Sequence, residues 1–351
     1  MSVNVFGRTS DGEIVNAYTI RNSSGMTATI ISFGATVTHL FVPDKTGELK
    51  DVQLGYDSIG AYEKGGTFFG AIIGRNANRV KDGKVVIDGV SYKMDCNDNE
   101  NNLHSGFNGT DKKVWTVLPQ DNDACITMMC KSNDLEQGLP GGLTMTVTYS
   151  ISEDNEFRIA YDAIPDKKTV INMTSHMYFN LKGHNGGSIE DHILTLYADT
   201  YNPVVDAKSI PTGENAPVEG TAFDFRSPKM IGRDINADDV QLDYVGGYDH
   251  NFVINGGTGK IRHFATLYSE ESGICMDLYS DMTGTQFYSG NLIGNQDGKD
   301  GAKYTDRSGM CLEPQYIPNV MNLIDESDTD SPIFDKDEHY HSESIYKFTV
   351  H

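Results

Sequence analysis

The sequence predicts an all-β protein, and three features of its pattern support that prediction. Polar and apolar residues alternate with a period of two in several segments, as they do in strands with one buried face. Glycine, with 36 copies, recurs beside Asn, Asp or another glycine between such segments, where tight hairpin turns require a positive φ. Long stretches with a helical period are missing. We therefore expect antiparallel strands, tight turns and a few short helices.

The individual elements follow from these signals along the chain. Residues 144–151, 157–163 and 274–278 alternate most clearly and are rich in residue types that fit a half-buried pleated surface. Residues 344–350 predict a final strand, and the acidic stretch 325–338 before it predicts a surface loop. The other predicted elements are short helices near residues 58–62 and 228–235 and hairpin turns at Asp82-Gly83, Asp88-Gly89, Asn108-Gly109, Gly141-Gly142 and Asn255-Gly256.

The length of 351 residues allows one domain or two, since all-β units commonly extend to about 200–250 residues. No linker divides the chain cleanly, and no repeat of fixed period is found. A propeller or a solenoid is therefore not expected.

The charge balance bears on possible partners. The chain carries 28 basic and 50 acidic residues, a formal net charge of −22, without a cluster of Lys and Arg. Binding along nucleic acid, or to an anionic membrane surface, requires the opposite field. We expect a solvated surface and neither of these partners.

The cysteines and the N-terminus predict a cytoplasmic protein. The five cysteines are odd in number and lack CxxC spacing, so free thiols in a reducing compartment fit best. The first residues, MSVNVFGRTSDG, show no charged leader with an apolar core, and no apolar stretch is long enough to suggest a membrane helix.

Several chemistries lack their usual motifs. The chain has no GxSxG elbow, no GxGxxG after a strand, no Walker loop and no HExxH. His339 and His341 would share one side of a strand, but HxH alone lacks the further ligands of a zinc site. We predict no metal site and no cofactor, and we interpret His39, His184, His192 and His263 as ordinary surface or core histidines.

Four separated segments place titratable groups among polar residues. They supply two imidazoles and two carboxylates, which suffice for acid/base chemistry. The segments are NNLHSG around His104, NMTSHMYFN around His176, GGYDHNF around Asp249 and CLEPQ around Glu313.

The period of a strand predicts which of these side chains face the same way. Residues 174–180 as a strand would put His176 and Tyr178 on one polar face, together with Thr174 and Asn180. A polar face inside a protein is more often a ligand surface than a packing surface. Adjacent Asp249 and His250 would point to opposite faces, so only one of them can belong to a site.

The segment around Glu313 also predicts a position in a sheet. Glu313 and Gln315 would share a face, and Pro314 between them cannot donate to a ladder. We expect an edge, a bulge or a strand end there.

Two further segments offer groups that suit a hydroxyl-bearing ligand. In GRNANRV, an extended chain would place Arg75 and Arg79 on one side and Asn76 and Asn78 on the other, unless a turn intervenes. Gln286 lies beside two aromatic residues, and amides and guanidinium groups offer several fixed hydrogen-bond donors.

The chain also resembles the aldose 1-epimerases of the galactose mutarotase family, in order from about residue 5 to residue 350. The resemblance implies one domain over residues 1–351, a large antiparallel β-sandwich of the galactose mutarotase type, and a cleft for a free hexose. The similar segments are GRNANRVKDGK, NNLHSG, INMTSHMYFNL, ADTYNPVVDAKSIPTGENAPVEGTAFDFR, GYDHNF, TGTQFYSGN and SGMCLEPQYIPN.

The resemblance also implies residue roles. Glu313 is similar to the family's catalytic base and His176 to its catalytic acid. The implied substrate-binding residues are Asn78, Arg79, His104, Asp249 and Gln286. Ser105 departs from the family, in which a second glycine is frequent after the histidine, and Pro314 and Tyr316 also differ from the family's usual residues. The oligomeric state stays open between monomer and homodimer.

These roles make chemical sense on their own. Converting an α-aldose into its β-anomer requires taking the proton of the C1 hydroxyl, giving one to the ring oxygen, and reclosing the ring after rotation about C1–C2. With ordinary pKa values, a carboxylate and an imidazolium would be the acid/base pair at neutral pH. We expect an isomerase that acts on free hexoses such as galactose and glucose.

Three alternatives remain at this point. A hexose-6-phosphate 1-epimerase of the same fold would need further cations around the phosphate. A glycosidase would use Glu313 and Asp249 as its two carboxylates. A non-catalytic sugar-binding module would keep the cleft and lack the chemistry.

Overall fold

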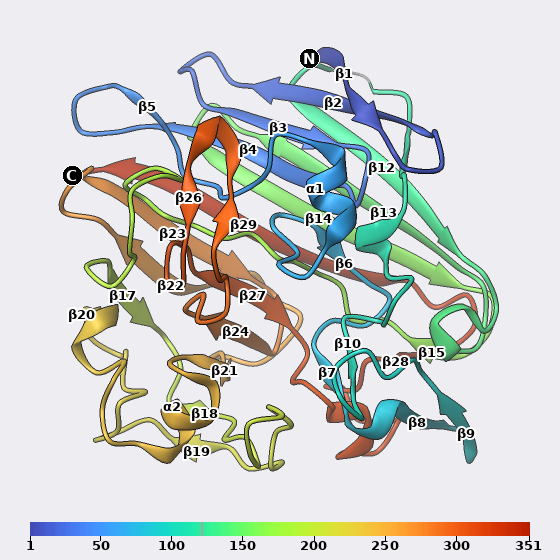
Figure 1. Cartoon of the computed structure of the whole chain (residues 1–351). Helices are drawn as coiled ribbons and strands as arrows, with labels where there is room; N and C mark the ends of the chain where they lie inside the picture. The colour runs from blue at the N-terminus through green and yellow to red at the C-terminus, as the bar shows by residue number, and fades with distance from the viewer. Residues whose placement is uncertain (121) are drawn as a thin grey trace.

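The computed structural model describes residues 1–120 and 122–351, and it is an antiparallel β-sandwich. Three main sheets and five two-stranded ladders make up the fold. The strand pairs of the main sheets run antiparallel. In Figure 1 the long strands of the largest sheet cross the molecule behind the N-terminal strands. The predicted fold class is confirmed.

The largest sheet has nine strands and forms one layer. Its four longest strands are neighbours, because the C-terminal strand inserts next to residues from the middle of the chain. In order across the sheet, the strands are β11 (Thr116–Val117), β12 (Cys125–Ser132), β13 (Leu143–Ile151), β14 (Glu156–Pro165), β29 (Tyr340–Val350), β23 (Ile274–Ser280), β22 (Arg262–Tyr268), β17 (Ile193–Leu196) and β20 (Lys229–Met230).

Two five-stranded sheets accompany the large one. The N-terminal sheet follows chain order, whereas the other collects strands from the second half of the chain. The first contains β1 (Ser2–Arg8), β2 (Ile14–Arg21), β3 (Thr27–Ile31), β4 (Thr36–Pro43) and β5 (Leu49–Asp51). The second, in order, contains β19 (Ala216–Pro217), β18 (Thr200–Tyr201), β21 (Asp249–Val253), β24 (Gly284–Tyr288) and β27 (Cys311–Gln315).

Short elements complete the fold. The ladders are β6 (Ile72–Ile73) with β16 (Thr174–Ser175), β7 (Arg79–Val80) with β10 (Asn102–Leu103), β8 (Lys84–Ile87) with β9 (Val90–Lys93), β15 (Thr169–Val170) with β28 (Ile333–Phe334), and β25 (Gln296–Asp297) with β26 (Lys303–Tyr304). The α-helices are α1 (Ile59–Lys64) and α2 (Val240–Val245), and the 3-10 turns are η1 (Lys81–Gly83), η2 (Thr110–Lys112), η3 (Glu136–Gly138), η4 (Ile231–Arg233), η5 (Lys299–Gly301) and η6 (Val320–Asn322).

One hydrophobic core joins the three main sheets. It contains buried residues such as Ile30 of β3, Tyr149 of β13 and Phe287 of β24. In β13 buried residues alternate strictly with more exposed ones, as the period of two predicts. Because strands from distant parts of the chain share this core, we retain one domain over residues 1–351 as a prediction.

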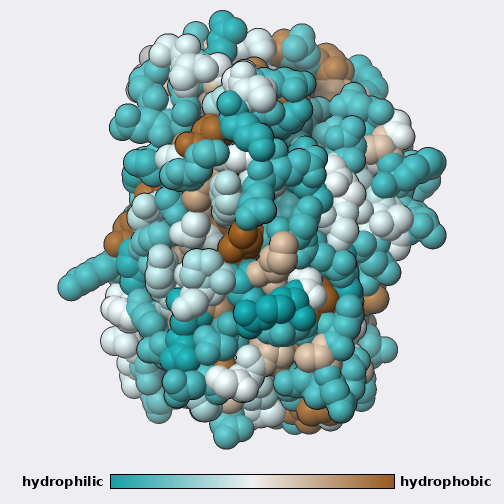
Figure 2. All heavy atoms as spheres, turned by 90° about the vertical axis from the view of Figure 1, so that its left-hand side faces the viewer, coloured by the Kyte–Doolittle hydropathy of each residue, from teal (hydrophilic) through white to brown (hydrophobic). Residues whose placement is uncertain are grey.

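The surface follows the composition. Figure 2 shows a mostly hydrophilic face with scattered hydrophobic residues, as expected for a net charge of −22. Among the described residues, no helix has both the length and the apolar character to cross a membrane.

Several local predictions are confirmed. Residues 144–151, 157–163 and 274–278 lie in β13, β14 and β23, and residues 344–350 lie in β29. The helix near residues 58–62 is α1. Asp88-Gly89 joins β8 to β9 with positive φ at both residues, as a two-residue hairpin turn requires.

Other local predictions are confirmed only in part or are wrong. The short helix near residues 228–235 is reduced to the 3-10 turn η4, because Lys229 before it pairs with Leu194 of β17 and belongs to β20. Helix α2 was not predicted, since six residues are too few for a clear helical period; its cap residues, Asp239 and Gly246, are the signal that was available. Asp82-Gly83, Asn108-Gly109 and Asn255-Gly256 do not join paired strands, because their glycines lie in η1 or in loops next to other elements. Gly141-Gly142 ends the loop of residues 133–142 between the paired strands β12 and β13, which is longer than a tight hairpin turn.

Candidate active site

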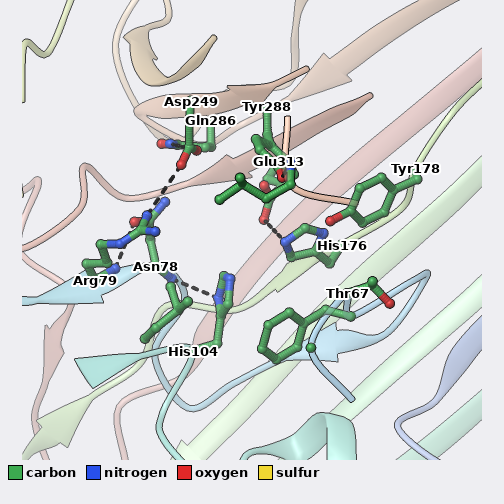
Figure 3. Close-up of a pocket in the computed structure, with 14 residues that line it drawn as sticks. Thr67, Asn78, Arg79, His104, His176, Tyr178, Asp249, Gln286, Tyr288 and Glu313 are labelled. Carbon is green, nitrogen blue, oxygen red and sulfur yellow. Dashed lines mark hydrogen bonds and ion pairs between the residues drawn. The ribbon is translucent and has the colours of Figure 1, made fainter. Parts of the chain in front are cut away.

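A pocket of about 150 Å³ brings together all seven site residues that the sequence predicts (Figure 3). They come from segments up to 235 positions apart, Asn78 and Glu313 being the most distant. The pocket is lined by Gly66, Thr67, Phe68, Asn78, Arg79, Leu103, His104, His176, Tyr178, Asp249, Gln286, Tyr288, Leu292 and Glu313.

One wall of the pocket is the face of three adjacent strands. Asp249, Gln286 and Glu313 lie on β21, β24 and β27, and Gln286 is the direct cross-strand partner of Glu313. Tyr288, two residues after Gln286 on β24, is the cross-strand partner of Asp249. The side chains of Asp249, Gln286, Tyr288 and Glu313 therefore share one face of the sheet. β27 is the edge of its sheet, which confirms the prediction made from Pro314.

Adjacent Asp249 and His250 point to opposite faces, as predicted. Asp249 lines the pocket, whereas the His250 ring is fully buried and packs edge-on against Phe223. Gln315 shares the face of Glu313 but is buried outside the pocket.

The opposite wall is built from turns. Asn78 and His104 have left-handed backbone conformations with φ of 62° and 51°, at the ends of the segments that lead into β7 and out of β10. The Asn78 N–H donates to Nδ1 of His104 over 3.1 Å. Ser105, also left-handed with φ of 68°, bonds through Oγ to both the N–H and the carbonyl of Asn76, which helps to hold this unusual backbone conformation.

His176 follows directly after β16, and this segment departs from the expected long strand. Only Thr174 and Ser175 pair as a strand, although Phe179 makes isolated bridges further on. The predicted alternation still holds for the residues near the pocket, since His176 and Tyr178 face the pocket while Phe179 lies in the core. Asn180 instead donates to the carbonyls of Gly187 and Ser308.

Glu313 and His176 meet at the floor of the pocket. Oε2 of Glu313 lies 3.7 Å from Nε2 of His176, with both side chains almost fully buried (Figure 3). Within the described part of the chain, Oε2 has no hydrogen-bond partner. The pair is therefore close but not locked together.

Burial changes the charge state expected for this pair. It raises the pKa of the Glu313 carboxyl well above its usual value, with a further contribution from Asp249, while Arg79 acts in the opposite direction. Burial also lowers the pKa of His176 to about 3. Burial thus favours the neutral forms of both groups over the expected carboxylate and imidazolium, because neither charge is well solvated there.

His104, His176 and Glu313 also resemble a metal-binding set, since their ligand atoms lie within 4.8 Å of one another. The hydrogen bond from Asn78 argues against that use. Because Nδ1 of His104 accepts it, the neutral ring carries its proton on Nε2 and offers the pocket a donor, not a lone pair. Burial and the nearby His176 keep the pKa of His104 low, so the ring stays neutral. This donor suits a sugar oxygen.

Charged groups at the other end of the pocket hold one another in place. Arg79 donates from Nε to Asp98 over 2.8 Å, and its Nη1 lies 3.6 Å from Asp249. Gln286 donates to the second oxygen of Asp249 over 2.7 Å. These residues present fixed donors and acceptors to a ligand without leaving a net excess of positive charge.

Arg75 does not belong to the site, so the extended interpretation of GRNANRV is wrong. Its guanidinium is fully buried and donates to five oxygens, those of Ser132, Asn133, Pro140, Gly141 and Thr169. The left-handed turn at Asn78 brings Asn78 and Arg79 to the pocket together.

Sequence reasoning missed part of the lining. Thr67 and Phe68 follow two glycines and form a wall, with the Phe68 ring 4.8 Å from His104 and 5.6 Å from His176. Leu292 is 82% exposed and lines the pocket as well. The Gly-Gly pair before two aromatic residues was the available signal, whereas Leu292 had none.

His339 and His341 lie on the surface, far along the chain from any site residue but Glu313. Nε2 of His339 and Nδ1 of His341 both approach the same oxygen of Asp162, at 2.8 and 2.9 Å. The two histidines thus face one side, as predicted, and bind a carboxylate.

Comparison with known proteins identifies the family. The family model for aldose 1-epimerase matches residues 16–347. A galactose mutarotase from Homo sapiens is 40% identical over 321 residues, which cover 91% of this chain and 90% of that protein. An aldose 1-epimerase from Escherichia coli K12 is 37% identical over 313 residues, 89% of each chain.

Solved structures agree with this result. A galactose 1-epimerase from Lactobacillus acidophilus superposes with a TM-score of 0.85 at 27% identity and covers 99% of this chain and 98% of that one. A GalM/aldose epimerase homologue from C. elegans gives 0.84 at 28% identity, with 96% and 99% covered. The chain belongs to the aldose 1-epimerase family.

Proposed function

We propose that this aldose 1-epimerase interconverts the α and β anomers of free hexoses such as galactose and glucose, with Glu313 as the base and His176 as the acid. The observation that carries this assignment is the 3.7 Å approach of Oε2 of Glu313 to Nε2 of His176 at the pocket floor. The C1 hydroxyl oxygen and the ring oxygen are bonded to the same carbon. A base and an acid that serve these two oxygens must therefore lie side by side.

The reaction needs one proton on this pair. In ring opening, ionised Glu313 takes the proton of the C1 hydroxyl while protonated His176 gives its proton to the ring oxygen. The resulting aldehyde turns about C1–C2. In reclosure, His176 takes the proton back from the C5 hydroxyl and Glu313 gives its proton to the aldehyde oxygen, which forms the other anomer.

The neutral pair that burial favours carries the same number of protons as the charged pair. One proton transfer from Glu313 to His176 converts the first into the second, and the two groups are close enough to do this through one hydroxyl of the sugar. Arg79 favours the ionised form of Glu313. Buried groups of this kind hold their charge only when a ligand replaces the missing solvent.

The other predicted residues hold the substrate in this proposal. Nε2–H of His104 donates to a sugar oxygen, and Asp249 and Gln286 form a pair that accepts from and donates to hydroxyls. Arg79 fixes Asp249 and offers its remaining N–H groups. Asn78 positions both neighbours, through its backbone N–H to His104 and its side-chain oxygen to the N–H of Arg79.

The alternatives find less support in this pocket. Arg79 is the only Lys or Arg among the described lining residues, and it already binds two carboxylates, so a phosphate clamp has no second cation. A glycosidase would use Asp249 and Glu313, but Asp249 is held by Arg79 and Gln286 and the two histidines would have no role. A binding module without catalysis would not need the Glu313–His176 approach.

Polarimetry on freshly dissolved α-D-galactose and α-D-glucose tests the proposal. We expect Glu313→Gln to lower kcat by about 10²–10⁴-fold, the usual contribution of one positioned proton transfer, with sugar affinity within severalfold of the wild type. Full activity of Glu313→Gln would refute its role as the base. Faster turnover of glucose 6-phosphate, or release of nitrophenol from a nitrophenyl galactoside, would support the corresponding alternative.

A further inference from the structure

A buried thiol lies directly behind the imidazole of His176. Sγ of Cys311 is 3.5 Å from Nδ1, the ring nitrogen on the side away from Glu313. Cys311 is two residues before Glu313 on β27, so both side chains lie on the same face of the strand. One short strand therefore contacts both nitrogens of the same imidazole.

We infer that Cys311 is a positioning residue for the reaction: its sulfur accepts the Nδ1–H of His176 and so keeps the proton that moves on Nε2. This inference rests on the proposed function, in which His176 is the acid. Neutral His176 must then carry its remaining proton on Nδ1, because Nε2 has to be free to take the proton of the C5 hydroxyl.

The chemistry of the thiol fits this role. Burial, and then the nearby carboxyl groups of Glu313 and Asp249, raise the pKa of Cys311 well above its usual value, so the group stays a neutral thiol. A neutral sulfur is a weak acceptor. It can orient the Nδ1–H without stabilising the imidazolium as strongly as a carboxylate behind the ring would, so the protonated ring stays a strong acid.

The surroundings leave the ring few other orientations. Tyr178 stacks on His176 with ring centroids 5.0 Å apart and planes 17° apart, and the Phe68 plane is inclined by 21°. A flip of the imidazole by 180° would place the carbon Cε1 where Nε2 now faces Glu313 and the carbon Cδ2 where Nδ1 now faces the sulfur. The Cys311 contact thus distinguishes two ring orientations that aromatic packing alone would accept.

A simpler interpretation is that Cys311 only fills space. It is fully buried and belongs to a hydrophobic cluster with Leu54, Phe69 and Tyr178. In that case its replacement by alanine would cost stability and leave the protonation of His176 as it is. The two interpretations therefore differ in a measurable property of the imidazole.

The experiment compares Cys311→Ala and Cys311→Ser with the wild type. Nitrogen-15 NMR of histidine-labelled protein, with the His176 signals assigned through His176→Gln, reports which ring nitrogen carries the proton at neutral pH. We expect Nδ1–H in the wild type and in Cys311→Ser, and a mixture of both tautomers in Cys311→Ala. The matched control is Cys275→Ala, another buried cysteine, on β23 and outside the pocket.

Kinetics on α-D-galactose provide the second readout. We expect Cys311→Ala to lower kcat by about tenfold, a part of the roughly 10²–10⁴-fold that a positioned acid contributes, with little change in KM. Cys311→Ser should recover most of this loss, and Cys275→Ala should show none. An Nε2–H tautomer in the wild type, or unchanged tautomer and kcat in Cys311→Ala, would overturn the inference.

The NMR measurement separates this inference from the proposed function. If Glu313→Gln and His176→Gln stay fully active, the proposed roles fail, and the tautomer data then describe a merely structural contact. If those variants lose activity while the tautomer does not respond to Cys311→Ala, the proposed function stands and the role of Cys311 is refuted.

Discussion

Two buried acid–base pairs in the described part of the chain are built differently. Lys299 and Asp51 join η5 to β5 with Nζ and Oδ2 only 2.6 Å apart, and the lysine also donates to the carbonyl of Thr38. Oδ1 of Asp51 accepts from the backbone N–H of Leu40. Glu313 and His176 are equally buried, but they are 3.7 Å apart and face an open pocket.

Under the proposed function, burial serves structure in one place and chemistry in the other. In the Lys299–Asp51 pair, the attraction and the extra hydrogen bonds oppose the desolvation of two charges, although burial still lowers the pKa of Lys299 below its ordinary value. In the Glu313–His176 pair this compensation is missing, so burial pushes both groups toward their neutral forms. A pair that is not fixed in one charge state can pass protons to a substrate.

The largest expected effect separates the two pairs by activity. His176→Gln should lower kcat by about 10²–10⁴-fold, because the acid is lost. It should change the free energy of unfolding little, since the replaced ring was not held by a strong ion pair. Polarimetry and urea unfolding of the same preparation measure both quantities. A variant that unfolds easily but keeps its kcat would show that His176 is structural.

The second largest effect is expected at the other pair. Lys299→Met should lower the free energy of unfolding by about 3–5 kcal/mol, because Asp51 is left as an unpaired buried charge. The kcat of the folded fraction should stay at the wild-type value. Lys303→Met is the control, since Lys303 pairs with Asp297 on the surface, with both side chains largely exposed. Lost activity in folded Lys299→Met would contradict the comparison.

The same contrast explains what the sequence could predict. The alternation in residues 144–151 and 157–163 identifies strands because it depends only on neighbouring residues. The site residues came from short polar segments and from the family resemblance. The charge states of Glu313 and His176 could not be predicted, because they depend on burial by residues distant in sequence.

Arg75 and Arg79 make the same point within one motif. They are four positions apart in GRNANRV, and period two places them on the same side. A left-handed turn at Asn78 sends Arg79 to the pocket while Arg75 stays in the interior. Asparagine tolerates a positive φ, but the residue type alone does not predict that a given asparagine adopts one.

A third prediction concerns acid stability and does not involve either pair. Burial lowers the pKa of His250 to about 3. Below the unfolded value of 6.5, the unfolded chain therefore binds a proton that the folded chain does not, so His250 makes stability fall as pH falls from about 6.5 toward 3. One such group contributes up to about 1.4 kcal/mol per pH unit.

Urea unfolding between pH 7 and pH 4 measures this slope. We expect His250→Gln to show a smaller loss of stability on acidification than the wild type, whatever its stability at pH 7. The stability-versus-pH slope of the variant is subtracted from that of the wild type, because other buried histidines and Glu313 also contribute to both slopes. An unchanged slope would mean that His250 is charged in the folded protein.

The smallest expected effect tests how Arg79 adjusts the Glu313–His176 pair. Arg79 opposes the rise in the pKa of Glu313, so removing its charge should raise that pKa further. As the pH rises, the pair loses its single proton when Glu313 ionises while His176 stays neutral. The alkaline limb of the kcat/KM profile should therefore move to higher pH in Arg79→Gln.

Arg79→Lys keeps a positive charge but loses the two-sided contact with Asp98 and Asp249, so its KM should rise while the alkaline limb of its kcat/KM profile stays in place. If Arg79→Gln and Arg79→Lys move the alkaline limb equally, the Glu313–His176 pair depends on the geometry of Arg79 and not on its charge.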